Sequence, residues 1–326
     1  MAPNRKKVLV PSNMGKQGVD ILKARDDIEL VVYPHTITHA DLHPMLADMH
    51  AIALSATPFR AAQTEASPAL QVVARIGVGY DAVEIPPLSA RKIPLMTAGI
   101  ANSTSVAEQA ISFFFALAKQ HAHRDALMRS GDWTHRYLHM PVELANKTAL
   151  IIGFGRIGTR TARKCAALDM NVLVYDPNVS QGMISGAGHT AVDDLDEAVA
   201  QADFISIHVP KKADTIDLFD AARIGRMKSS AFLVNTARGG IINEAALYDA
   251  LKGKKIAGAG LDVFDMEPTP KENRLFELPN IIAAPHMAGV TTEAVAAMAV
   301  AVARNILSVL DGRIVKDNVV NKEVLD

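Results

Sequence analysis

Cysteine, net charge and long apolar runs are all scarce in this sequence. Cys165 is the only cysteine among 326 residues, so the chain cannot form an internal disulfide, which favours a reducing cytoplasm. The 34 basic residues nearly balance the 35 acidic ones, so we expect neither nucleic acid nor an anionic membrane as a partner. The longest apolar run, residues 110–118, is too short for a bilayer, which needs about 20 residues. No apolar stretch of signal-peptide length follows the basic N-terminus.

Apolar residues make up 49% of the chain, enough for large buried cores, and its length predicts about two domains. In the first hundred residues, short apolar runs alternate with helical or turn segments, which predicts a parallel α/β sheet. Its strands are expected at residues 8–10, 30–33, 51–54, 72–76 and 94–96. The segment TAGIANS, residues 97–103, then indicates a hinge that leads into a helix over about 103–120.

A second series of strands and helices begins at residue 148 and predicts a doubly wound sheet. Its six strands are expected at residues 148–152, 172–175, 204–207, 232–235, 257–261 and 281–283. The final helix, about 291–310, has no strand of this sheet left to follow it, so we expect it to return to the first domain. The predicted domains are a discontinuous one, residues 1–101 with 291–326, and a dinucleotide-binding one, residues 102–290.

A glycine-rich turn, GFGRIG, occupies residues 153–158. An apolar run precedes it and a helical segment over 156–168 follows it, which is the context that a dinucleotide-binding turn requires. Gly153 permits the tight turn, Gly155 allows the backbone to approach a pyrophosphate, and Gly158 allows the helix to pack closely on the sheet. The pyrophosphate would lie at the helix N-terminus, where free N–H groups and the helix dipole favour an anion.

Asp176 follows the next apolar run, about 20 residues after the turn. A carboxylate at this point accepts hydrogen bonds from the adenosine ribose hydroxyls. It would also repel the additional 2′-phosphate of NADP at short range. The sequence therefore predicts NAD as the cofactor.

Three charged or titratable side chains follow the last three apolar strands. Arg238 lies in NTARGG, Glu267 in GLDVFDMEP and His286 in APHMAG. The carboxyl edge of the strands borders the ligand crevice in an open α/β sheet, so we expect these side chains there. An arginine after a strand is commonly part of a surface ion pair, and a single histidine is commonly structural. The three together, in this order behind a dinucleotide turn, favour a catalytic set.

These residue types suit the reduction of a 2-oxo acid. Arginine offers a planar fork for the substrate carboxylate. Histidine titrates near neutral pH and can supply the proton that the carbonyl oxygen gains when hydride arrives. A carboxylate beside that histidine would stabilise its protonated form and fix its tautomer, and Glu267 is suitable for this role.

The three segments resemble the signature blocks of the D-isomer-specific 2-hydroxyacid dehydrogenase family, which includes glycerate/hydroxypyruvate reductases and D-lactate, phosphoglycerate and formate dehydrogenases. The resemblance covers nearly the whole chain. RIGVGYDAVEI at 75–85 resembles the substrate-loop block, NSTSVAEQA at 102–110 the hinge-helix block, and GDW at 131–133 the dimer arm. It implies two doubly wound parallel-sheet α/β domains, a Rossmann-type cofactor domain and a flavodoxin-like substrate domain made from both ends of the chain, in a homodimer.

The resemblance also implies roles for individual residues. Arg238 binds the substrate carboxylate, His286 is the acid/base, and Glu267 is its partner. The backbone at Val78 and Gly79 also holds the carboxylate. The implied cofactor contacts, besides the three glycines of the turn and Asp176, are Val106, Arg156, Ile157, Val209, Pro210, Thr215, Thr236, Ala237, Arg238, Asp262, His286 and Ala288.

The resulting hypothesis is reversible hydride transfer between NAD(H) and a small D-2-hydroxy acid/2-oxo acid pair, with a substrate such as glyoxylate or hydroxypyruvate. Two alternatives stay open: a formate- or phosphite-type dehydrogenase of the same family, and an NAD-sensing corepressor that acts by binding a partner. Lys211 and Lys212 stand where the family usually has Leu-Thr, and we expect them to alter affinity on the adenosine side.

Two pairs of histidines have the i, i+4 spacing that can bind a metal on a helix: His39 with His43, and His135 with His139. Neither pair has an obvious Asp, Glu or Cys partner set, so no metal is expected. Trp133 is interpreted as a core anchor or, by the family resemblance, as an arm residue that reaches a neighbouring active site. The regulatory extension of long phosphoglycerate dehydrogenases is not in this sequence, so serine feedback through it is not expected.

Overall fold

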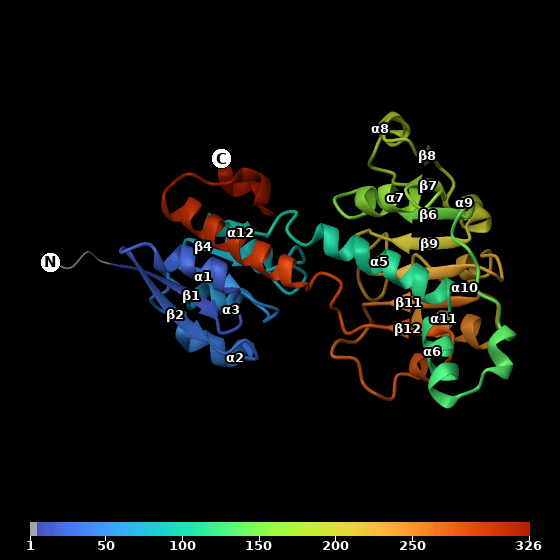
Figure 1. The fold of residues 1–326 in the computed structure, drawn as a ribbon. Coiled ribbons are helices and arrows are strands. Elements are labelled where there is room, and N and C mark those ends of the chain that lie inside the picture. The colour runs from blue at the N-terminus through green and yellow to red at the C-terminus, as the bar shows by residue number, and fades with distance from the viewer. Residues whose placement is uncertain (1–4) are drawn as a thin grey trace. The chain divides into compact units, whose positions relative to one another are not determined.

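The computed structural model describes residues 5–326. The first four residues, part of the N-terminal segment in which no signal peptide is expected, lie outside the described residues. The chain forms two compact α/β units (Figure 1). Unit 1 comprises Met1–Asn102 and Gly289–Asp326, and unit 2 comprises Ser103–Ala288.

Unit 1 is built on a parallel sheet of five strands in the order β2-β1-β3-β4-β5. This is the flavodoxin-like order, in which the direction of winding reverses between β1 and β3. The strands are β1 (Lys6–Pro11), β2 (Ile28–Tyr33), β3 (Ala51–Leu54), β4 (Val72–Arg75) and β5 (Leu95–Met96).

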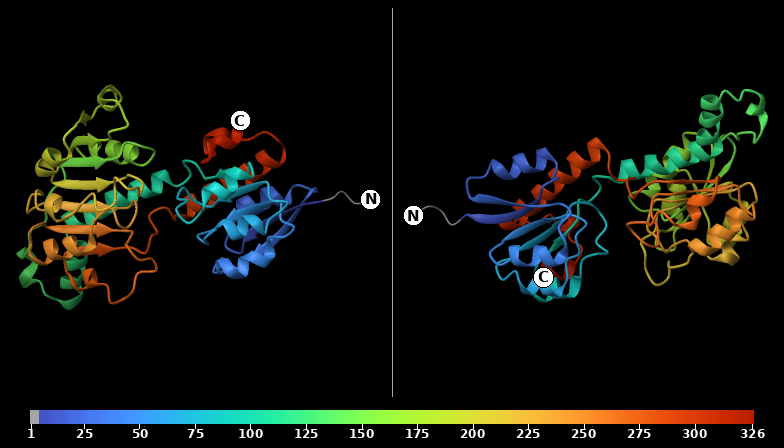
Figure 2. Two further views of the ribbon diagram at one scale, coloured as in Figure 1. Left: turned by 180° about the vertical axis from the view of Figure 1, so that it is seen from behind. Right: turned by 90° about the horizontal axis from the view of Figure 1, so that it is seen from below.

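Helices cover both faces of this sheet. On one face, α1 (Lys16–Lys23) and α12 (Thr292–Leu310) lie side by side (Figures 1 and 2). By length and composition α12 could cross a membrane, but Val302 and Ile306 are fully buried against the sheet, which accounts for its apolar character. The remaining helical elements of unit 1 are α2 (His39–Leu42), η1 (His43–Met45), α3 (Ala61–Glu65), α4 (Ile85–Ala90), η4 (Lys316–Asn318) and η5 (Lys322–Leu325).

Unit 2 is built on a parallel sheet of seven strands in the order β12-β11-β10-β9-β6-β7-β8. This is the doubly wound order of a dinucleotide-binding domain with one additional strand, and winding reverses between β6 and β9. The strands are β6 (Thr148–Ile152), β7 (Asn171–Tyr175), β8 (Thr190–Ala191), β9 (Phe204–Ile207), β10 (Phe232–Asn235), β11 (Gly258–Leu261) and β12 (Ile281–Ala283).

The prediction of six strands in the second sheet was wrong because it omitted β8. This strand has only two residues, Thr190 and Ala191, and lies at the sheet edge against β7. Neither residue is fully buried, so the sequence contains no apolar run to mark the strand. The predicted α/β class with two doubly wound parallel sheets is confirmed.

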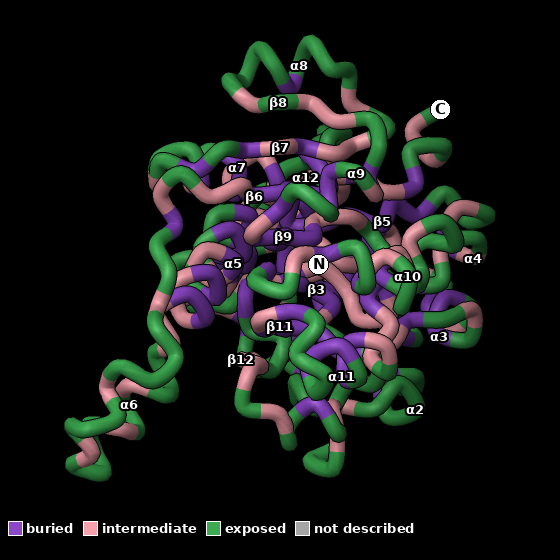
Figure 3. The backbone as a smooth tube through the Cα atoms, turned by 90° about the vertical axis from the view of Figure 1, so that its right-hand side faces the viewer, coloured by how far each residue is buried: buried purple, intermediate pink, exposed green. Residues whose placement is uncertain are grey.

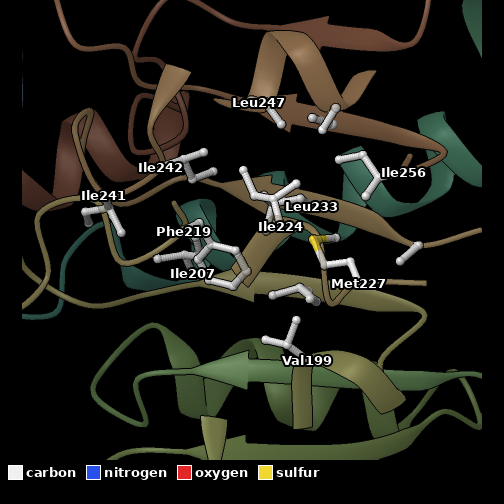
Figure 4. Close-up of a cluster of buried hydrophobic side chains, with 14 of the residues drawn as sticks. Val199, Ile207, Phe219, Ile224, Met227, Leu233, Ile241, Ile242, Leu247 and Ile256 are labelled. Atoms are coloured by element: carbon white, nitrogen blue, oxygen red, sulfur yellow. The ribbon is translucent and has the colours of Figure 1, made fainter. Parts of the chain in front are cut away.

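The two faces of the second sheet have separate cores. Figure 4 shows one of them, in which Leu233 and Ile207 from the strands pack with Val199 and Leu247 from the helices. The helices on that face are α9 (Leu195–Gln201), α10 (Ala221–Ile224) and α11 (Glu244–Lys252). The helices on the other face are α5 (Ser103–Ala118), α7 (Gly158–Ala166) and α8 (Gln181–Gly186).

Within unit 2, an exposed arm follows α5 and consists of α6 (His121–Ser130) and η2 (Thr134–Tyr137). None of the residues in these two elements is buried, and most of the arm is exposed (Figure 3). A further short helix, η3 (Arg274–Glu277), precedes β12.

Candidate active site

The glycine-rich turn joins β6 to α7 at the carboxyl edge of the second sheet. Gly153 has φ +92°, a conformation that favours glycine. A Cβ on Gly158 would lie 1.8 Å from the Gly153 carbonyl oxygen, so only glycine permits this contact between turn and helix. A Cβ on Gly155 would meet nothing within 4 Å. The turn is therefore closed on its inner side and open at Gly155.

Asp176 follows β7 and holds the same turn. One carboxylate oxygen accepts the Phe154 N–H at 2.7 Å, and the other accepts the Asn178 N–H at 2.9 Å. The Gly153 N–H also donates to the Tyr175 carbonyl oxygen at 2.8 Å. Asp176 thus lies directly beside the glycine turn, as an acidic residue that meets a ribose must in this fold.

Arg238 lies on a tight turn after β10 that Asn235 organises. The buried Asn235 side chain accepts the Ala237 N–H at 2.9 Å and donates to the Arg238 carbonyl oxygen at 2.8 Å. The Arg238 guanidinium donates to the Ala237 carbonyl oxygen at 2.6 Å. Sequence reasoning overlooked Asn235, although a polar residue at the end of the apolar run FLVN was a usable signal.

His286 and Glu267 form a direct pair. Their Nδ1 and Oε2 atoms are 2.7 Å apart, and the other Glu267 oxygen accepts the Phe264 N–H at 3.0 Å. Burial raises the pKa of the Glu267 carboxyl, but the hydrogen bonds from His286 and Phe264 and the charges of His286 and Arg238 outweigh it, so this pKa lies below its ordinary value. The His286 side chain remains 48% exposed in the chain, and Nδ1 is the nitrogen that faces Glu267, so Nε2 is the one available to a ligand.

Arg238 lies close to this pair because the two loops that carry them pack together. A Cβ on Gly239 would lie 1.8 Å from the Phe264 carbonyl oxygen, so the Arg238 turn is pressed against the loop that leads to Glu267. The charge of Arg238 contributes to lowering the pKa of Glu267. The structure therefore brings the three predicted catalytic residues together within unit 2.

Two buried polar atoms near this edge have no hydrogen-bond partner within residues 5–326: Thr236 Oγ1 and His208 Nδ1. Thr236 follows β10 and His208 follows β9, so both lie at the carboxyl edge of the sheet that also carries the glycine turn and the Arg238 turn. Burial lowers the pKa of His208 to about 3, which keeps its imidazole neutral. Orphaned polar atoms beside an open glycine turn fit a polar ligand such as a dinucleotide.

Of the remaining predicted residues, two belong to unit 1 and the others to unit 2. Thr215 lies on the loop after β9, where its hydroxyl accepts the Lys212 N–H and donates to the Pro210 carbonyl oxygen, both at 2.7 Å, so it shapes this loop. Val78 and Gly79 follow β4 in unit 1. The other predicted cofactor residues lie in unit 2, on α5, on the glycine turn and after β9, β10, β11 and β12: Val106, Arg156, Ile157, Val209, Ala237, Asp262 and Ala288.

No group of three or more His, Cys, Asp or Glu side chains placed to hold a metal occurs between residues 5 and 326. His135 pairs with Asp132 at 2.7 Å, while the ring of His139 faces His123 at a centroid distance of 5.7 Å. Trp133 is 62% exposed, so the interpretation of it as a core anchor was wrong for the single chain. Cys165 is buried on α7, and burial raises the pKa of its thiol to about 12.

Comparison with known proteins agrees with the family resemblance seen in the sequence. Residues 111–288 match the family model for the NAD binding domain of D-isomer specific 2-hydroxyacid dehydrogenase. The chain is 36% identical over 314 residues to the D-3-phosphoglycerate dehydrogenase of Archaeoglobus fulgidus, covering 96% of this chain and 59% of that protein. It is 36% identical over 264 residues to the glyoxylate reductase of Thermofilum pendens, covering 80% and 78% of the two chains.

Among solved structures, the chain is similar to a D-lactate dehydrogenase from Aquifex aeolicus complexed with NAD and lactic acid. The TM-score is 0.86, the sequence identity is 26%, and the match covers 96% of this chain and 99% of that one. The chain spans 54–59% of the length of three phosphoglycerate dehydrogenases that it matches over 94–97% of its own length.

Proposed function

Because the chain belongs to the D-isomer-specific 2-hydroxyacid dehydrogenase family, we propose that it transfers hydride reversibly between NAD(H) and a small D-2-hydroxy acid/2-oxo acid pair. The observation that carries this proposal is the 2.7 Å contact between His286 and Glu267 beside the Arg238 turn. An acid/base pair next to a carboxylate-binding cation is what reduction of a 2-oxo acid requires.

In the proposed reduction, a 2-oxo acid, NADH and a proton give a 2-hydroxy acid and NAD⁺. The guanidinium of Arg238 binds the substrate carboxylate and orients the carbonyl group. Protonated His286 donates its Nε2 proton to the carbonyl oxygen, while the carboxylate of Glu267 at Nδ1 stabilises the imidazolium. NADH supplies the hydride when it is bound. In the oxidative direction neutral His286 accepts the hydroxyl proton.

The glycine turn supports the proposal for the cofactor. The open side at Gly155 leaves room for a pyrophosphate at the N-terminus of α7, with Arg156 and Ile157 next to it in sequence. Thr236, which follows β10 at the same edge of the sheet, supplies a buried hydroxyl that has no hydrogen-bond partner among residues 5–326. We propose a preference for NAD over NADP, which the position of the Asp176 carboxylate beside the glycine turn supports, since a carboxylate there would repel the 2′-phosphate of NADP.

A small 2-oxo acid such as glyoxylate or hydroxypyruvate is the proposed substrate. Similarity to a glyoxylate reductase over most of both chains supports this choice. Steady-state reduction with NADH would be measured on glyoxylate, hydroxypyruvate and pyruvate, and oxidation with NAD⁺ on formate and phosphite. Turnover of an oxo acid alone is expected. Turnover of formate or phosphite alone would instead favour the alternative dehydrogenase, and tight NADH binding with no turnover would favour a corepressor.

The exposed arm supports a homodimer as the proposed assembly. Met128, Trp133 and Tyr137 are each more than 60% exposed on it, and so is Met140 just after it. Several large apolar side chains on one projecting segment are typical of a protein–protein interface. Light scattering after size exclusion is expected to give twice the chain mass of 34.9 kDa, and Tyr137→Glu is expected to shift it toward a monomer.

A cytoplasmic location is also proposed. The single cysteine is buried and cannot form a disulfide within the chain, which suits a reducing compartment. Cell fractionation with an antibody to the native chain tests this, and recovery in a secreted or membrane fraction would contradict it.

A further inference from the structure

Asn305 is a buried polar side chain on α12, among the apolar residues Val302 and Ile306 that pack against the first sheet. Its Nδ2 donates to the Thr97 carbonyl oxygen at 2.8 Å, and its Oδ1 accepts a hydrogen bond from Nδ2 of Asn318 at 2.9 Å. A buried amide is costly unless its polar atoms are hydrogen-bonded, and here the oxygen and the nitrogen both are. Asn305 thus holds the segment that follows β5.

That segment in turn holds the loop that follows β4. The Ala98 N–H donates to the Gly77 carbonyl oxygen at 2.9 Å, beyond the last paired residues of the two strands. The next two residues of the loop are Val78 and Gly79, whose backbone the family resemblance assigns to the substrate carboxylate. One hydrogen bond therefore connects Ala98 to the start of the proposed substrate loop.

The planarity of the peptide bond carries this connection further. In a trans peptide the carbonyl group of one residue and the N–H of the next lie in one plane and point in opposite directions. The Thr97 carbonyl shares a plane with the Ala98 N–H, and the Gly77 carbonyl shares a plane with the Val78 N–H. Fixing the Thr97 carbonyl at Asn305 therefore orients the Ala98 N–H, and the hydrogen bond from Ala98 orients the Val78 N–H.

The inner part of this relay is shielded from water. Thr97 and Ala98 are buried, like Asn305 itself. Hydrogen bonds in series polarise one another, and they do so most strongly where the dielectric is low. The relay thus begins in the core under α12 and ends at a backbone donor of the half-buried residue Val78.

The C-terminal segment after α12 gives the relay a second anchor. The Thr97 N–H donates to the Asn318 carbonyl oxygen at 2.9 Å, and the Val320 N–H donates to the Leu95 carbonyl oxygen at 2.8 Å. Both backbone groups of Thr97 are therefore bonded to the C-terminal part of the chain. The Thr97 peptide has little freedom to turn while Asn305 and Asn318 are in place.

We propose that Asn305 is a positioning residue for substrate binding, which directs the Val78 N–H toward the substrate carboxylate through the Thr97–Ala98 and Gly77–Val78 peptides. The inference rests on the proposed function, in which the backbone of unit 1 supplements Arg238 in binding the carboxylate. Asn305 was not among the residues predicted from the sequence. Its effect falls on the binding of the oxo acid, whereas His286 acts on the transfer of the proton.

The test is Asn305→Leu in the full chain, since leucine has a similar shape but cannot donate to the Thr97 carbonyl. We expect KM for glyoxylate to rise about 10-fold, as when a hydrogen bond to a charged group is weakened. The value of kcat should stay within about threefold of wild type, because the contact exists before and during the reaction. An unchanged KM would overturn the proposal.

NADH binding supplies an internal control for the same variant. All the predicted cofactor residues lie in unit 2, whereas the relay lies in unit 1. The Kd for NADH in Asn305→Leu is therefore expected to change by less than about twofold. An increase in this Kd equal to the increase in KM would mean a general loss of structure and would contradict a specific role.

Asn321→Leu is the matched control on the C-terminal segment. Asn321 is also buried, but its side chain accepts the Leu95 N–H at 2.8 Å and donates to the Ile93 carbonyl oxygen at 3.0 Å, both at the start of β5. This variant should lower Tm about as much as Asn305→Leu while KM stays normal. Equal rises of KM in the two variants would refute the relay.

A milder variant keeps the proposal testable if Asn305→Leu does not fold. Asn318→Ala removes the donor to Asn305 Oδ1 from a half-buried position and leaves the Asn318 carbonyl oxygen in place for Thr97. Loss of this neutral hydrogen bond should raise KM for glyoxylate about 2- to 10-fold. A wild-type KM in Asn318→Ala would count against the proposal.

Amide exchange examines the relay without any turnover. The Ala98 amide should be strongly protected in the wild-type protein and should exchange at least about tenfold faster in Asn305→Leu or Asn318→Ala. Rapid exchange of Ala98 in the wild type would overturn the proposal. Absence of oxo-acid turnover in the wild type would refute the proposed function, whereas turnover with the same KM in wild type and Asn305→Leu would refute only the role of Asn305.

Discussion

The glycine-rich turn offers a sharp test of the proposed NADH site, because Gly155 and Gly158 are required for different physical reasons. Gly155 is exposed, does not have a positive φ, and has open space where a Cβ would be. Gly155→Ala should therefore leave the fold intact or stabilise it by about 0.4–1 kcal/mol, since alanine reduces the entropy of the unfolded chain. If a pyrophosphate lies on this turn, the new methyl group instead occupies the space that it needs.

The expected loss of affinity follows from one displaced N–H contact to a charged group. Such a hydrogen bond contributes about 1.5–3 kcal/mol, so the Kd for NADH should rise roughly 10- to 150-fold in Gly155→Ala. Titration of NADH fluorescence gives the Kd, and thermal unfolding gives Tm. A wild-type Kd with an unchanged Tm would refute the assignment of the turn to the cofactor.

Two other glycines act as controls. Gly186 on α8 also has open space at its Cβ and no positive φ, so Gly186→Ala should change neither the Kd nor the fold. In Gly158→Ala the methyl group would meet the Gly153 carbonyl oxygen at 1.8 Å, where backbone atoms cannot move aside. That variant should lower Tm or fail to fold. Equal effects of the substitutions at 155 and 158 would mean that the turn is only structural.

The remaining predictions concern the charged residues. His286→Ala should lower turnover by about 10²-fold or more, and near-normal turnover in steady-state assays would exclude it from proton transfer. Glu267→Gln should lower kcat for reduction, because protonated His286 loses the carboxylate that faces its Nδ1 atom at 2.7 Å; an unchanged kcat would reject the pairing. The folded-state pKa of Glu267 lies below its ordinary 4.5, so its ionised form contributes stability above that pH and this is lost on acidification. The Tm difference between wild type and Glu267→Gln should therefore shrink between about pH 7 and pH 3. Arg238→Ala should raise KM for the oxo acid while the Kd for NADH stays normal, and equal losses in both would make Arg238 structural. Asp176→Ala should reduce the preference for NADH over NADPH, and an unchanged ratio of their Kd values would contradict its role.

Most of the fold could be predicted from apolar runs because buried parallel strands are nearly continuous runs of apolar residues. The run at Phe204–Ile207 is buried throughout and is found at the expected residues. Two exceptions have physical reasons. β8 is too short and too exposed to leave a pattern, and the predicted helix to residue 120 ends at Ala118, since Gln120 has φ +54°.

The charged and titratable residues of the candidate site could be predicted from the sequence, because their type and their position directly after a strand are visible there. Arg238, Glu267 and His286 could be proposed because the loops after parallel strands all begin at the same edge of the sheet. The contacts that hold these side chains could not be predicted, because they depend on backbone conformation. Nothing in the sequence APHMAG indicates that the backbone of His286 adopts a left-handed conformation. Nothing in it indicates that the N–H groups of Met287 and Ala288 donate to Asp262.

The polar residues at the strand ends share one structural role that explains how the edge is organised before a ligand arrives. Asp176 after β7 accepts an N–H from the glycine turn, Asn235 at the end of β10 closes the Arg238 turn, and Asp262 after β11 holds the His286 loop. Each reaches its own turn or the loop of the neighbouring strand. Catalytic groups fixed in this way need little reorganisation when charge develops on the substrate, which is the condition under which electrostatic catalysis is most effective. Substitution of any of the three should therefore affect rate more than its distance from the reacting atoms suggests.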